Sequence, residues 1–81
     1  LTANPYYTPL ILAAADRLTD PIQQYELINT ASDFNRDPYL WIRKVQAARM
    51  SNLDNYASQA LQEMSKWLSW DQIEKLQYSI Q

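Results

Sequence analysis

Oxygen-bearing side chains alternate at Asp33, Asn35 and Asp37, which is how a calcium-binding loop begins. The glycine that such a loop needs at its sharp turn is missing, and Lys44 occupies the position of the bidentate glutamate. We therefore interpret this segment as a helix end, a turn and an N-cap, and we expect no metal site here.

Two pairs of carboxylates are the other candidates for chemistry: Asp16 with Asp20, and Asp33 with Asp37. Paired carboxylates can act as acid and base when burial drives their pKa values apart. Here each pair straddles a predicted helix end, where Asp20 and Asp37 serve as caps. We therefore expect no catalytic residues.

The composition of the 81-residue chain excludes several classes of function. Without His or Cys there is no zinc site, thiolate nucleophile or Ser-His-Asp triad, and without Gly there is no glycine loop for phosphate. The net charge of −2 argues against nucleic-acid binding. The longest apolar run, at 10–15, is too short to cross a membrane. We expect no cofactor, and the compartment stays open because a cysteine-free domain survives in either redox environment.

Capping residues followed by proline or by an apolar run predict five helices. The first is expected over 9–18, with Thr8 as its N-cap, and the second from Asp20-Pro21. The third is expected from Asp37-Pro38 to a stop at Asn52, a residue that tolerates the left-handed conformation. The fourth is expected over 54–68, and the last opens with a Ser69-x-x-Gln72 capping box.

A short motif of Asn or Asp followed by Pro-Tyr occurs twice: Asn4-Pro5-Tyr6 recurs as Asp37-Pro38-Tyr39, 33 residues later. Each is followed by two predicted helices, and this period with two helices per unit is the spacing of tetratricopeptide repeats. The residues of the second unit that resemble this family are Trp41, Val45, Ala48, Asn52 at the turn, Ala57, Leu61 and Met64. Lys44 departs from the pattern, because the family usually has Leu there.

The resemblance implies an all-α fold in which antiparallel helical hairpins stack as a right-handed superhelix. The hairpins are expected over 4–37 and 38–68, with a closing helix over 69–81, in one domain. The main alternative is an isolated bundle of four or five helices. Because repeat arrays generally need about three units, we expect the native protein to continue before Leu1, or the segment to dimerise through its exposed hairpin face.

The implied function is a non-catalytic scaffold or interaction module that binds a protein or peptide. In such repeats the first helix of each hairpin lines the concave surface, and the register places Tyr39, Ile42, Gln46 and Arg49 there. Arg36, Arg43 and Lys44 make this region locally basic, so we expect Arg49 to pair with an acidic partner and Tyr39 and Ile42 to supply apolar contact.

Two alternatives remain open. The face could be solvated, with Ile42 packed against the next hairpin, or the chain could be an accessory or regulatory helical domain of a larger enzyme with no ligand of its own.

Overall fold

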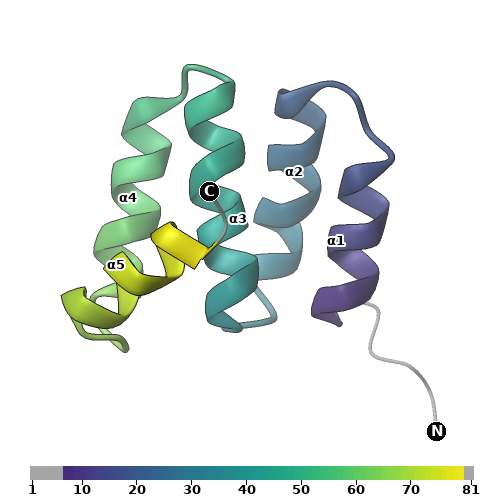
Figure 1. The fold of residues 1–81 in the computed structure, drawn as a ribbon. Coiled ribbons are helices and arrows are strands. Elements are labelled where there is room, and N and C mark those ends of the chain that lie inside the picture. Colours follow the sequence, from purple (N-terminus) through teal and green to yellow (C-terminus); the bar gives the residue numbers. More distant parts are fainter. Residues whose placement is uncertain (1–6, 80–81) are drawn as a thin grey trace, which may run out of the picture.

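A computed structural model describes residues 7–79, and all the regular structure in this range is helical (Figure 1). The helices are α1 (Thr8–Asp16), α2 (Pro21–Ser32), α3 (Pro38–Met50), α4 (Asp54–Met64) and α5 (Trp70–Ser79). The prediction of an all-α chain with about five helices is confirmed. The Asn4-Pro5-Tyr6 copy of the repeat and the end of the predicted closing helix lie outside the described residues.

Helices α1 to α4 stand side by side and run alternately up and down, and α5 crosses in front of the lower parts of α4 and α3 (Figure 1). Consecutive helices therefore form antiparallel hairpins, as expected from their short connections. Helix α3 is the centre of the arrangement, because it contacts α1, α2, α4 and α5. This packing is that of a stack of helical hairpins.

The predicted acidic caps are confirmed at two helix starts. Asp20 Oδ1 accepts a hydrogen bond from the backbone N–H of Ile22, and Asp37 Oδ1 accepts one from that of Tyr39, both at 3.0 Å. Each carboxylate satisfies a donor that the helix leaves without an internal partner.

The predicted capping box of α5 is also present. The backbone N–H of Ser69 donates to Gln72 Oε1 at 3.0 Å, and the N–H of Gln72 donates back to Ser69 Oγ at 3.2 Å. These reciprocal bonds fix the start of α5 and hence the direction in which it leaves the preceding turn.

The prediction for Thr8 is wrong, because it is the first residue of α1 and Tyr7 precedes it as the N-cap, without a side-chain capping bond. The Thr8 hydroxyl instead accepts a hydrogen bond from Asn35 Nδ2 at 3.0 Å. A tertiary partner from the α2–α3 loop has thus replaced the local one that the sequence offered.

Asn52 ends the second hairpin's first helix as predicted, with φ of 60°. The N–H of Leu53 donates to the carbonyl of Ala48 at 2.8 Å, and the N–H of Asn52 donates to that of Arg49 at 3.1 Å. These two bonds define a Schellman motif, in which the left-handed residue lets the chain turn back on the helix end.

Helix α4 ends at Met64, earlier than the predicted Leu68. The backbone N–H groups of Trp67 and Leu68 both donate to the Met64 carbonyl, at 3.1 and 2.8 Å, and this closes a tight turn. Both side chains still pack against the core. Their burial continues the apolar pattern past the true end of the helix, which is why the pattern alone overestimated its length.

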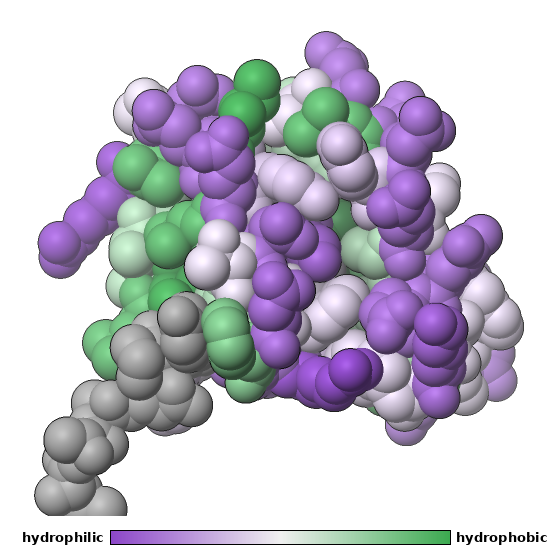
Figure 2. Space-filling model, turned by 180° about the vertical axis from the view of Figure 1, so that it is seen from behind, coloured by the Kyte–Doolittle hydropathy of each residue, from purple (hydrophilic) through white to green (hydrophobic). Residues whose placement is uncertain are grey.

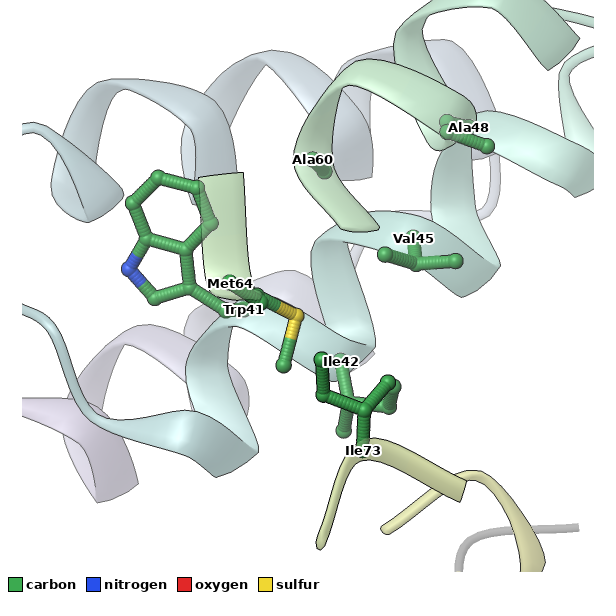
Figure 3. Packing of buried hydrophobic residues seen from close by; sticks show 8 residues of the cluster. Trp41, Ile42, Val45, Ala48, Ala60, Met64 and Ile73 are labelled. Carbon is green, nitrogen blue, oxygen red and sulfur yellow. The ribbon is translucent and has the colours of Figure 1, made fainter. Parts of the chain in front are cut away.

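The core consists of two clusters that meet at α3. The first joins α3, α4 and α5 through Trp41, Ile42, Val45, Ala48, Ala57, Ala60, Met64 and Ile73 (Figure 3). The second joins α1, α2 and the start of α3 through Ile11, Ala15, Ile28, Ala31 and Leu40. The alanines allow close approach of the helices, and the larger side chains fill the remaining space.

Candidate partner-binding face

The structure separates the four residues that the sequence placed on one binding face. Tyr39 is 54% exposed, Arg49 is exposed and Gln46 is half-buried, whereas Ile42 is 0% exposed. Three of the four predicted residues are therefore accessible to a partner.

The expectation that Ile42 would line an open groove is wrong. Ile42 belongs to the same buried cluster as Ile73 of α5, and Figure 3 draws the two side chains next to each other where α5 reaches α3. The position of α5 depends on the turn after α4 and on the Ser69–Gln72 capping box, so the spacing along α3 does not reveal it. The alternative, with Ile42 packed against the next hairpin, agrees with the structure in burying this residue, but the element that covers it is the single helix α5.

An open row of side chains nevertheless runs along α3, formed by Tyr39, Arg43, Gln46 and Met50. Their spacing of i, i+4, i+7 and i+11 places them on one side of the helix. Met50 is 65% exposed, although it is a large apolar residue at a helix end. We call these four residues the α3 face.

A cavity lies beside the α3 face in the angle between α2 and α3. Its volume is about 350 Å³, and it is lined by Gln24, Ile28, Arg43, Gln46, Ala47 and Met50. The side chain of Arg43 at its edge is held by Asp16 of α1, with Nη2 2.8 Å from Oδ1. This ion pair bridges the two hairpins and fixes the guanidinium at the cavity mouth.

A second cavity, of about 380 Å³, lies at the other end of the face between α3 and α5. It is lined by Pro38, Tyr39, Leu68, Gln72, Lys75 and Leu76. Sequence reasoning missed the contribution of α5 to this site, because no spacing rule connects a residue of α3 with a helix that crosses it. The row along α3, in contrast, could have been found from the sequence, because its residues follow the i, i+4, i+7 and i+11 spacing of one helix side.

The basic region predicted around α3 does not form one patch. Arg36 lies 3.8 Å from Glu63, Arg43 pairs with Asp16, and Lys44 is buried on another side of the helix. Among the residues of the predicted region, Arg49 remains exposed beside the α3 face.

Between Tyr7 and Ser79, the acidic side chains form no group that could hold a metal ion. Within the same range, no helix has the length and apolar character needed to cross a bilayer.

No protein-family model, curated protein or solved structure matches this chain.

Proposed function

We propose that the chain is a non-catalytic interaction module that binds a peptide or partner protein along the α3 face. The observation that carries the proposal is the row from Tyr39 to Met50, which is exposed at both ends and half-buried at Arg43 and Gln46, with a cavity at each end. An aromatic ring and a thioether presented to solvent beside preformed cavities are typical anchor points for the side chains of a partner.

The charges near this face favour a partner with acidic residues. Arg49 and Lys75 present cationic groups beside apolar lining, and a guanidinium can bind a carboxylate through two parallel hydrogen bonds. The expected ligand is therefore a segment in which apolar side chains alternate with Asp or Glu.

The same proposal includes the architecture. The hairpins α1–α2 and α3–α4 would be two units of a tetratricopeptide-like right-handed superhelix, with α5 as the closing helix. The contacts of α3 with both α1 and α5 support this, because first helices of successive units contact one another in such a stack.

A random peptide library displayed on phage and selected against the purified chain tests the binding proposal. We expect enriched peptides to combine acidic and apolar residues, and to lose about tenfold or more in affinity for a Tyr39→Ala/Arg49→Ala variant. Gln23→Ala, on the exposed side of α2, is the matched control. Enriched peptides that bind both variants equally would refute the site, and a failure to enrich any peptide would refute the proposed function.

A second candidate function, an accessory helical domain docked on a larger protein or on a second copy, is favoured by the outer side of α1. Leu10 is 53% and Tyr7 56% exposed, and hydrophobic colour gathers over the α1 side of the molecule (Figure 2). Sedimentation at several concentrations, with Leu10→Asp as the disrupting variant, separates these cases. Self-association that this variant abolishes would indicate a homodimer, and a monomer at every concentration would leave the surface to another protein.

A further inference from the structure

Lys44 is the most unusual ionisable residue of the structure. It is only 8% exposed, and its Nζ donates a hydrogen bond to Ser32 Oγ at 3.1 Å. The same nitrogen lies 4.3 Å from the centroid of the Trp41 ring, in a cation–π contact. The hydroxyl of Ser32 is itself buried and donates to the carbonyl of Asn29 at 2.8 Å, so its oxygen lone pairs face the ammonium.

This buried ammonium has no direct counter-ion among residues 7–79, where no carboxylate oxygen lies within 4.0 Å of its Nζ. Burial lowers the pKa of Lys44, and the more distant carboxylates of Asp33 and Glu63 oppose that shift. Glu63 is already engaged, at 3.1 Å from Lys66 and 3.8 Å from Arg36. A desolvated charge without a paired partner is costly, and an anion placed against it would be correspondingly well bound.

A groove leads to Lys44 between α2 and α4. Its volume is about 310 Å³. Besides Lys44, it is lined by Tyr25, Asn29, Trp41, Tyr56, Gln59, Ala60 and Glu63. The rings of Tyr25 and Tyr56 lie against each other, with centroids 5.9 Å apart, and form an apolar wall from two different hairpins. The side-chain amides of Asn29 and Gln59 add hydrogen-bond donors.

The groove is distinct from the α3 face. With about 100° of rotation per residue, Lys44 lies about 140° around α3 from Tyr39 and about 160° from Gln46. Ile42, which packs in one cluster with Ile73 of α5, lies about 160° around α3 from Lys44, so the groove lies on the side of α3 away from α5. A ligand here would leave the α3 face free.

We propose that the groove between α2 and α4 binds a carboxylate carried on an apolar body, with the carboxylate against Lys44 and the body against the tyrosine rings. The charged side chains near the groove leave one positive charge in excess, which a single carboxylate would neutralise. Arg36, Lys44 and Lys66 carry three positive charges, and Asp33 and Glu63 carry two negative ones. The mixture of rings and donors fits an amphipathic acid better than inorganic phosphate, which has no apolar part. The site is independent of the peptide-binding role proposed above.

Titration of the intact chain with 3-phenylpropionate, followed by NMR chemical shifts, tests the proposal. We expect saturable shifts at residues of the groove, and binding about tenfold weaker for the neutral 3-phenylpropionamide, which cannot form the charge-assisted bond. A short peptide with adjacent Phe and Glu, compared with its Phe-Gln counterpart, distinguishes a protein-borne carboxylate from a free acid. Equal binding of acid and amide, or no binding of either carboxylate probe, would overturn the proposal.

Variants locate the charge that is responsible. Lys44→Met keeps the apolar stem and removes the ammonium. The affinity for whichever carboxylate probe binds the parent chain, 3-phenylpropionate or the Phe-Glu peptide, should therefore fall about tenfold. Arg17→Met, which removes a positive charge at the exposed C-cap of α1, is the matched control and should bind as the parent does. Unchanged affinity in Lys44→Met would show that this residue does not hold the anion.

A pH series on the unaltered chain keeps the test valid even if Lys44→Met folds poorly. The groups that face Lys44 are Asp33 and Tyr25 from α2, and Tyr56 and Glu63 from α4. Burial raises the pKa of Tyr25 above its usual value. Because burial lowers the pKa of Lys44, affinity should decline as the pH rises toward the usual lysine value of 10.5 and the ammonium is lost. A flat profile would contradict a Lys44-dependent site.

Discussion

Replacement of Ile42 by Ala distinguishes a core position from the groove position that spacing alone predicted. Ile42 is fully buried in the cluster that joins α3, α4 and α5. The change removes three carbon atoms, for which burial contributes about 0.8 kcal/mol each, or about 2.4 kcal/mol in total. The cavity that remains adds to this loss, and comparable substitutions cost about 2–5 kcal/mol.

Such a loss is large for this chain, because about 0.05–0.15 kcal/mol per residue gives a total stability of only about 4–12 kcal/mol. The Tm should fall by about 4–8 °C for each kcal/mol lost. Urea and thermal unfolding followed by circular dichroism measure both quantities. Tyr39→Ala, at an exposed position of the same helix, is the control and should change stability by about 0.5 kcal/mol or less.

The expected pattern is thus a stability defect for Ile42→Ala and a binding defect for Tyr39→Ala. Ile73→Ala and the double variant extend the test, because two side chains that share one cavity should show non-additive losses of about 0.5 kcal/mol or more. A loss below about 1 kcal/mol for Ile42→Ala, or full additivity with Ile73→Ala, would refute the packing of α5 on α3.

Three further predictions concern local features. Asn52→Ala should destabilise the chain by about 1–2 kcal/mol in urea unfolding, because a Cβ-bearing residue other than Asn is disfavoured at its positive φ, whereas Asn52→Gly should preserve or raise stability. Ser69→Ala should cost about 1 kcal/mol by removing the capping acceptor of α5, and an unchanged midpoint would show that the box does not contribute. Because the folded pKa of Lys44 is lowered, the unfolded chain binds more protons, so stability should rise with pH as it approaches the unfolded value of 10.5. The raised pKa of Tyr25 has the opposite effect on stability, but only above pH 10.0. In Lys44→Met, the increase of stability with pH below 10.0 should therefore be smaller.

The features that the sequence predicted correctly are those set by neighbouring residues. Asp37 and the Ser69–Gln72 pair satisfy helix donors within three residues of themselves, and Asn52 ends a helix through its own backbone conformation. Amphipathic spacing likewise identified the side of α3 that carries Trp41 and Val45 against α4. Local chemistry sufficed for these, so the element order and the hairpins followed.

The features that were missed depend on contacts between distant segments. Thr8 lost its expected capping role to Asn35, 27 residues away. Ile42 is buried because α5 turns back across α3, and Lys44 is buried because Ser32 and the Trp41 ring receive its side chain. A lysine in a basic stretch is ordinarily solvated, and nothing in its neighbours along the chain distinguishes it.

The central place of α3 explains why both candidate sites involve this helix. One side packs on α4 through Val45, another on α2 through Leu40, and a third on α5 through Ile42. The sides of α3 that these contacts leave uncovered are the α3 face and the groove at Lys44. Neighbouring helices supply walls to each of them. The groove at Lys44 has walls from three helices, α2, α3 and α4, and a preformed recess of this kind lowers the cost of ordering on binding. The outer side of α1 instead presents the exposed side chains of Tyr7 and Leu10.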